Sequence, residues 1–91
     1  MLILVQIDIS VADVALYDAY ETKVLALLEN YGAKLEERLR SADGRTEVHL
    51  LYFPDVEALK AFRADPARAA VQDMWLQCGA SSASTEVVRL S

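Results

Sequence analysis

His49 is the only histidine in the sequence, and its imidazole is the side chain best suited to proton transfer near neutral pH. Strand alternation is expected to bring it to one end of a sheet face with Asp8, Glu47 and Arg38. There His49 would move a proton, Arg38 would stabilise a developing oxyanion, and Asp8 would orient the imidazole. The direction of the His49 pKa shift stays open, because Arg38 would lower this pKa and Asp8 or Glu36 would raise it. The alternative is a histidine that only joins a hydrogen-bond network at a dimer interface.

Two arginines, Arg38 and Arg40, lie two residues apart on one expected strand. Paired guanidinium groups suit planar anions such as a carboxylate or a phenolate. The competing interpretation, which we favour, is an edge strand in which Arg40 pairs with Glu47 and Lys34 discourages aggregation.

Four aromatic side chains recur on the segments expected to enclose the core, namely Tyr17, Tyr20, Tyr52 and Trp75. They could line a pocket between the helices and the sheet in which an aromatic ligand stacks. Such a stripe is more often plain core. Tyrosine hydroxyls need a polar partner, however, so two of them on one helix turn indicate a wet cavity.

Metal or cofactor binding has little support in the sequence. The single histidine could join Asp8, Glu36 and Glu47 in a hard-ligand site, but no pair of histidines at ligand spacing exists. Cys78 is the only cysteine, so neither an intrachain disulfide nor a cysteine cluster can form. Phosphate-binding loops and dinucleotide fingerprints are missing too. We expect no metal and no cofactor.

The 91-residue chain is expected to form one domain over residues 1–91. Its net charge of −5 argues against nucleic acid or an anionic membrane as a partner, because either requires a basic face. Residues 1–9 are apolar but lack a basic leader and a cleavage site, and no run is long enough to cross a bilayer. These features predict a soluble, cytoplasmic protein.

The pattern of apolar residues predicts the element order β-α-β-β-α-β. Strands are expected at 1–9, 33–41, 46–53 and 84–90, with a tight turn at 42–45. The first helix is expected to start at a capping box formed by Ser10 and Asp13 and to end at Gly32. The second is expected to start at Asp55 and to break at Asp65-Pro66. This order is the α+β, ferredoxin-like split βαβ pattern, an antiparallel sheet with helices on one face.

Alternation also predicts which strand residues face the helices. The expected set is Ile3, Val5, Ile7, Ile9, Leu35, Val48, Leu50 and Tyr52. The open face would then have an apolar half and a polar half; the apolar half is Leu2, Leu4, Leu51 and Phe53, and the polar half is Gln6, Asp8, Glu47 and His49. An apolar half-face on a small domain predicts a symmetric homodimer packed sheet against sheet.

Several short motifs carry a family resemblance: Tyr31 to Leu35 (YGAKL), Tyr52 to Asp55 (YFPD), and Phe62 followed by Asp65-Pro66. Together with the element order, they resemble the dimeric α/β-barrel superfamily. It includes cofactor-independent monooxygenases of the antibiotic-biosynthesis type, muconolactone isomerase, haem-handling proteins and uncharacterised bacterial families, and this chain is most similar to the last. The resemblance implies a dimeric α/β barrel without fixing an activity.

Two hypotheses follow for the function. In the first, the homodimer binds a small aromatic or anionic metabolite and performs isomerisation or cofactor-free oxygenation by proton transfer. In the second, it is a non-catalytic module that binds a ligand or a protein. The second predicts that the polar cluster is satisfied by its own salt bridges, with no cavity beside His49.

Overall fold

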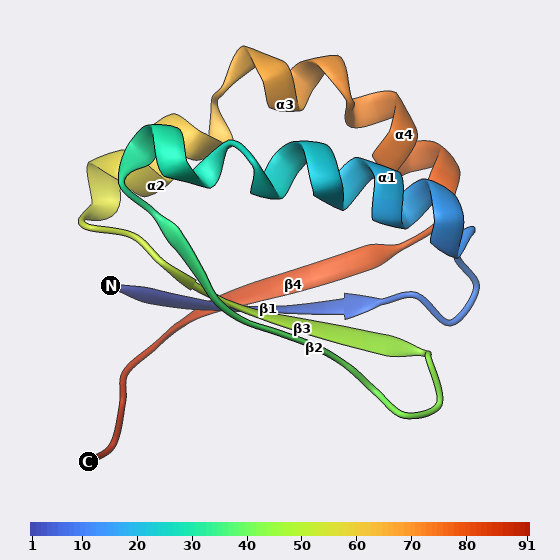
Figure 1. Ribbon diagram of the computed structural model, residues 1–91, viewed down its shortest axis with the longest axis horizontal. Helices are drawn as coiled ribbons and strands as arrows, with labels where there is room; N and C mark the ends of the chain where they lie inside the picture. The colour runs from blue at the N-terminus through green and yellow to red at the C-terminus, as the bar shows by residue number, and fades with distance from the viewer.

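The computed structural model describes residues 1–91 and has one four-stranded antiparallel sheet in the order β2-β3-β1-β4. Four α-helices and a short 3₁₀ segment connect the strands and cover one face of the sheet (Figure 1). The elements are β1 Leu2–Asp8, α1 Val14–Leu25, η1 Leu28–Tyr31, β2 Lys34–Arg40, β3 Thr46–Tyr52, α2 Val56–Arg63, α3 Pro66–Ala70, α4 Gln72–Cys78 and β4 Ser81–Val87. The predicted ferredoxin-like order is confirmed, and the second helical region is broken into α2, α3 and α4.

Side-chain caps fix where most of these helices begin. Asp55 caps α2 through the backbone N–H of Ala58, and Asp65 caps α3 with Pro66 at its first position, both as predicted. The first helix begins later than expected, because Asp13 is its cap, and α1 ends at Leu25 instead of Gly32. Gly32 ends the 3₁₀ segment η1 that follows it. Ser10 instead donates from its backbone N–H and its hydroxyl to Asp8, which ties residues 8–10 into a turn.

The last strand differs from its predicted range. It begins at Ser81 rather than 84, since Ser81 and Ala83 pair with Asp8 and Gln6 of β1. Pairing with a central strand thus outweighs the low strand propensity of this Ser/Ala run. Leu90, expected in the strand, lies in the tail beyond it and is 93% exposed.

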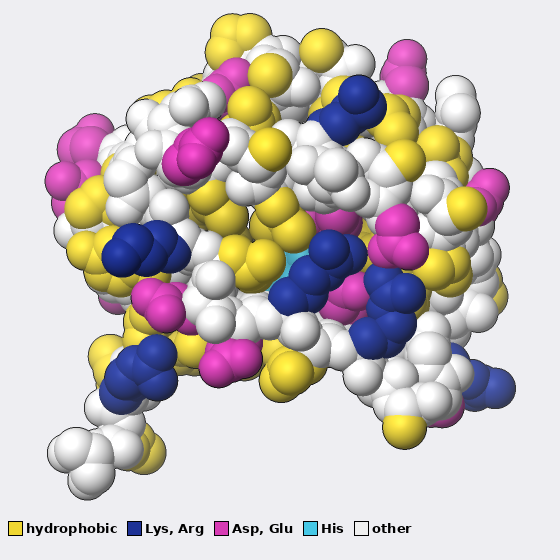
Figure 2. All heavy atoms as spheres, viewed as in Figure 1, with side chains coloured by type: hydrophobic (Ala, Val, Ile, Leu, Met, Phe, Trp, Pro, Cys, Tyr) yellow, Lys and Arg dark blue, Asp and Glu magenta, His cyan; other side chains and the backbone are white.

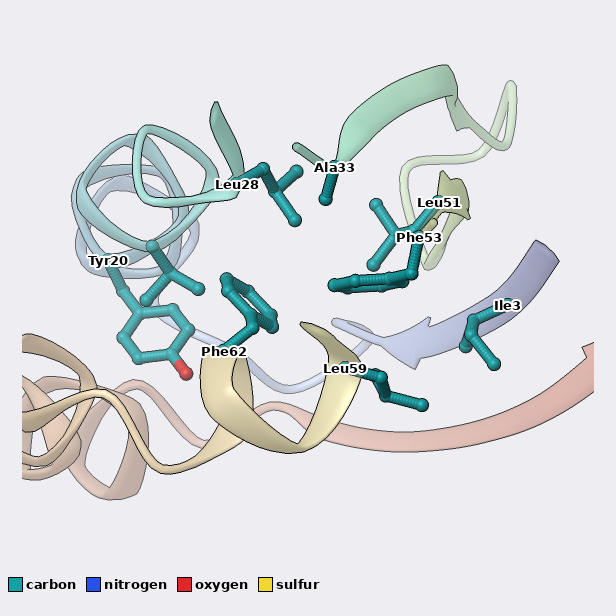
Figure 3. Close-up of a cluster of buried hydrophobic side chains, with 9 residues drawn as sticks. Ile3, Tyr20, Leu28, Ala33, Leu51, Phe53, Leu59 and Phe62 are labelled. Carbon is teal, nitrogen blue, oxygen red and sulfur yellow. The ribbon is translucent and has the colours of Figure 1, made fainter. Parts of the chain in front are cut away.

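The main hydrophobic cluster packs between the helices and the sheet. Figure 3 shows Leu28 of η1, Phe53 after β3 and Phe62 of α2 pointing toward one another. Phe53 and Phe62 have ring centroids 5.5 Å apart, a distance at which tilted aromatic pairs attract.

None of the helices has both the length and the apolar composition needed to span a bilayer.

The predicted orientation of β3 is wrong. Residues directly opposite on antiparallel strands share a face, and Ile3 pairs with Leu51 while Val5 pairs with His49. The face beneath the helices therefore carries Glu47, His49, Leu51 and Phe53 together with the β1 residues expected there. The expected pairing was one residue out of register, and such a slip exchanges every side chain between the two faces.

The open face is apolar nevertheless. Leu2 and Leu4 lie on it as predicted, but they pair with Tyr52 and Leu50 instead of meeting Leu51 and Phe53. These side chains, with Val48, are half-buried in the single chain. No helix lies over this face (Figure 1).

Candidate functional site

A cavity of about 340 Å³ lies between the helical layer and the sheet. Apolar residues of β1, β3, α1 and α2 form most of its wall, and Trp75 of α4 closes part of it. The polar side chains in the lining are Glu21, His49, Arg63, Arg68, Gln72, Ser82 and Ser84. In Figure 2 the imidazole is visible between hydrophobic and basic side chains, with acidic side chains close by. The volume is sufficient for a small ligand.

His49 is held by a single hydrogen bond to a buried carboxylate. Its Nε2 lies 2.5 Å from Oε2 of Glu47, and the residue is 3% exposed. No buried side-chain nitrogen or oxygen in the structure lacks a partner. Nδ1 makes no hydrogen bond within the protein and therefore keeps accessible surface, and the cavity that His49 lines is the open space beside it.

Glu47 is 1% exposed and sits at the centre of this network. The hydroxyl of Tyr17 donates to Oε2 at 2.6 Å, and the Nε atoms of Arg38 and Arg40 donate at 3.1 and 2.9 Å. Arg40 adds a second bond to Oε1 at 2.7 Å, so its guanidinium contacts the carboxylate with two nitrogens. The arginines also reach Asp18 of α1, which links β2 to the helical layer.

These contacts determine which groups are charged. Burial raises the pKa of Glu47, but its hydrogen-bond donors outweigh burial and hold the pKa at about 2. Glu47 is therefore an ionised acceptor at neutral pH. Burial, followed by the hydrogen bond to Glu47, raises the pKa of Tyr17, so its phenol keeps its proton.

The protonation state of His49 follows from the same network. Burial lowers its pKa below the ordinary 6.5, and the lowering exceeds the opposite effect of Glu47. A neutral imidazole carries one proton, and an ionised Glu47 can only accept, so that proton is on Nε2. Nδ1 is then an unprotonated nitrogen that faces the cavity, which is the form a general base requires.

Glu21 is a polar cavity residue that the sequence analysis missed. It is 6% exposed, and burial, followed by the charge of Glu47, raises its pKa to about 7. The sequence does contain a signal, because Glu21 lies among Tyr17, Tyr20 and Val24 in the buried stripe of α1. A carboxylate is rarely buried in such a stripe unless it has a partner.

Two arginines in the cavity lining have no carboxylate partner. Arg63 reaches Ser84 at 3.5 Å, and the guanidinium of Arg68 lies 4.9 Å from the ring centroid of Phe62. All ion pairs of the structure belong to Arg38, Arg40 and His49. Arg63 and Arg68 thus leave two positive charges available to an anionic ligand.

The structure separates the residues that were expected to act together. Asp8 lies on the open face and binds Ser10, so the expected contact with His49 is not formed, and Glu47 contacts the imidazole instead. Arg38 is close to His49 through Glu47, but it is absent from the cavity lining. The separation of Asp8 from His49 follows from the orientation of β3.

Only part of the expected aromatic pocket forms. Tyr20 and Trp75 line the cavity, with ring centroids 5.2 Å apart. Tyr17 lies behind the lining against Glu47, and Tyr52 is on the open face, where it pairs with Leu2. No group of three histidine, cysteine or acidic side chains is placed to hold a metal ion.

Comparisons with solved structures identify the same fold in other proteins. SnoaB, a cofactor-independent oxygenase from Streptomyces nogalater, aligns with a TM-score of 0.73 at 12% identity over 98% of this chain and 94% of its own. A dimeric ferredoxin-like protein of unknown function from Jannaschia sp. CCS1 gives 0.66 at 15% identity, over 96% of this chain and 100% of its own. An uncharacterised NIPSNAP domain protein from Burkholderia xenovorans gives 0.63 at 18% identity, over 100% of this chain and 98% of its own.

Sequence comparisons give no match, either to a family model or to a curated protein. The sequence identities to the solved structures are low, so the structural similarity establishes the fold alone. The predicted resemblance to dimeric ferredoxin-like proteins, cofactor-independent oxygenases among them, is therefore confirmed as a likeness of architecture.

Proposed function

We propose that this protein is a cofactor-independent proton-transfer enzyme acting on a small, partly aromatic metabolite that is phenolic or enolisable. The observation that carries the proposal is the bare Nδ1 of His49, which opens to a cavity of about 340 Å³. Tyr20 and Trp75 offer aromatic surfaces to such a ligand, and Arg63 and Arg68 offer positive charge.

In this proposal His49 is the general base. Nδ1 accepts a proton from a C–H or O–H group of the ligand, and the ionised Glu47 stabilises the imidazolium that forms. Arg38 is a positioning residue, because it holds Glu47 and does not line the cavity. Arg63 or Arg68 takes the role of stabilising the developing oxyanion. Asp8 has no part in the reaction.

The resulting carbanion has two outcomes that need no cofactor. Reprotonation at another carbon gives an isomer. Addition of O2, with the proton returned from His49, gives a hydroperoxide. Loss of water then breaks its O–O bond and the remaining C–H bond of that carbon and leaves a new carbonyl group, with O2 as the oxidant. The similarity of fold to a cofactor-independent oxygenase supports the second outcome.

The cytoplasmic location predicted from the N-terminal residues stays a prediction.

The test uses β-tetralone, a bicyclic aromatic ketone with acidic C–H bonds next to its carbonyl group. Binding is followed by the fluorescence of Trp75, the only tryptophan, which lines the cavity. In D2O buffer we expect the protein to exchange the acidic hydrogens for deuterium faster than buffer alone, as measured by proton NMR. Oxygen uptake recorded in parallel distinguishes oxygenation from isomerisation.

Binding without exchange or oxygen uptake would contradict the proposal and favour the non-catalytic module. That alternative predicts a polar cluster closed by its own salt bridges, with no cavity against His49. The cluster around Glu47 is indeed satisfied internally, but Nδ1 and the cavity beside it weigh against the module.

We propose further that the protein is a homodimer through the open face of the sheet. Leu50 pairs with Leu4 on this face. Replacing Leu50 by lysine is expected to weaken the affinity of the dimer at least about a hundredfold, because two-fold symmetry places a new charge from each subunit in the interface. Sedimentation velocity measures the change, with Leu76→Lys on the exposed side of α4 as the control. A monomeric wild-type protein at micromolar concentration would contradict the proposal.

A further inference from the structure

The cavity contains a second titratable group, Glu21, that proton transfer to His49 leaves unused. Glu21 lies on the buried side of α1 and is 6% exposed. It makes no ion pair, and the hydroxyl of the neighbouring Tyr17 donates to Glu47. The Glu21 carboxyl lies beside the Tyr17 hydroxyl, and Glu21 is one of the residues that line the cavity.

Several charged and titratable groups face Glu21 from the surrounding elements. They are Tyr17 of α1, Arg38 of β2, Glu47 and His49 of β3, and Arg68 of α3. Burial and then the charge of Glu47 raise the pKa of Glu21 to about 7, against the smaller opposite effects of Arg38, Arg68 and a hydrogen bond with Tyr17. At neutral pH a large share of the molecules therefore carries a carboxylic acid here, which can donate a hydrogen bond.

The two proton-carrying groups of the cavity are thus in complementary states. His49 presents a bare nitrogen, and Glu21 presents an acidic O–H while it remains protonated. The positive charge of Arg68 is then free to attract an anion. If Glu21 loses its proton, its negative charge compensates Arg68 and repels an anionic ligand.

We propose that Glu21 is the second proton-transferring residue of this cavity, and that it donates to the oxygen of an aromatic oxyanion held beside His49 and Arg68. The inference rests on the proposed function and narrows its ligand class to phenolates and enolates. In the reaction, a ligand C–H bond breaks and its proton goes to Nδ1 of His49. The O–H bond of Glu21 breaks as a new O–H bond forms on the ligand. The ketone thereby becomes its enol with no change of oxidation state, and exchange of one proton with water restores the two residues.

Binding of an aromatic oxyanion tests the inference without requiring the natural substrate. Dinitrophenolate stays ionised throughout neutral pH, and calorimetry measures its affinity from about pH 6.5 to about pH 8, a range above the His49 pKa. We expect the wild-type affinity to fall about tenfold by one pH unit above the pKa of Glu21, because only the protonated form binds well.

The variant Glu21→Gln keeps a hydrogen-bond donor at this position and removes its titration. Its affinity is expected to match the wild-type value at the lower pH and to stay constant as the pH rises. Glu57→Gln removes an equal charge from an exposed position of α2 outside the cavity, and it should keep the wild-type pH dependence.

Three results would overturn the inference: no binding of dinitrophenolate, a wild-type affinity that does not fall, or the same fall in Glu21→Gln. Failure of the proposed function is recognised separately. If binding depends on Glu21 but β-tetralone undergoes neither exchange nor oxygen uptake, the anion site stands and the catalysis is wrong. If β-tetralone exchanges its hydrogens but binding of dinitrophenolate does not depend on Glu21, the proposed catalysis is supported and the proposed role of Glu21 is wrong.

Discussion

Replacing Glu47 by glutamine is expected to lower the free energy of unfolding by about 3–5 kcal/mol, the usual effect of removing one member of a buried charge network. Glutamine has nearly the same shape, so the loss comes from the charge and its hydrogen bonds rather than from a cavity. Arg38 and Arg40 would lose their shared carboxylate, and the Tyr17 hydroxyl would face a weaker acceptor. For a domain of this size, the loss is a large part of the total stability.

Urea unfolding followed by circular dichroism measures this change. Glu37→Gln is the matched control, because Glu37 is an exposed residue of β2 with no ion pair, and it should change the stability by less than about 0.5 kcal/mol. Equal effects of the two substitutions would show that the carboxylate of Glu47 does not hold the network together.

The same carboxylate predicts how stability depends on pH. The pKa of Glu47 is about 2 in the folded protein and close to 4.5 when exposed. A lowered pKa contributes stability that is present above pH 4.5 and is lost as the pH falls toward 2. The contribution amounts to about 3 kcal/mol. Glu47→Gln should therefore differ from the wild type at neutral pH and converge with it in acid.

Replacing His49 by glutamine is expected to slow deuterium exchange of β-tetralone by about 10²- to 10⁴-fold, the usual contribution of a general base. The glutamine amide can still donate to Glu47, so the network and the fold should be kept. What is lost is the unprotonated nitrogen that faces the cavity. Binding of β-tetralone, measured by Trp75 fluorescence, should change little.

Asp8→Asn serves as the comparison, because the sequence assigns Asp8 to the same machinery and the structure places it on the opposite face. Its exchange rate should stay within about twofold of the wild type. An unchanged exchange rate in His49→Gln would show that His49 is not the general base. A large loss in Asp8→Asn would show that the open face takes part in the reaction.

The fold could be predicted because its determinants are local. Asp55 and Asp65 cap α2 and α3, and Pro66 fits the first position of α3. Gly32 ends the helical segment before β2 with a φ of 67°, which glycine favours, although it ends η1 and not α1. Alternation marked the first three strands. The last strand was placed too late, because Ser81 to Ala83 have low strand propensity and become a strand only by pairing with β1.

The candidate site was harder to predict, because it depends on the orientation of a single strand. Both faces of β3 are largely apolar, since Leu51 and Phe53 alternate with Val48, Leu50 and Tyr52. Alternation with Val48, Leu50 and Tyr52 placed against the helices left Glu47 and His49 on the open face. Here Tyr17 and two arginines supply the hydrogen bonds that make burial of Glu47 possible. Those partners come from other elements, and pattern alone does not reveal them.

The central claim is that His49 is neutral at pH 7, with its proton on Nε2 and a bare Nδ1 in the cavity. Because the protein has one histidine, a long-range proton–nitrogen correlation spectrum of the ¹⁵N-labelled protein contains a single imidazole. We expect a protonated Nε2, an unprotonated Nδ1 and a titration midpoint below 6.5. An imidazolium at pH 7, or a proton on Nδ1, would contradict the account, because His49 would then have no base to offer the ligand.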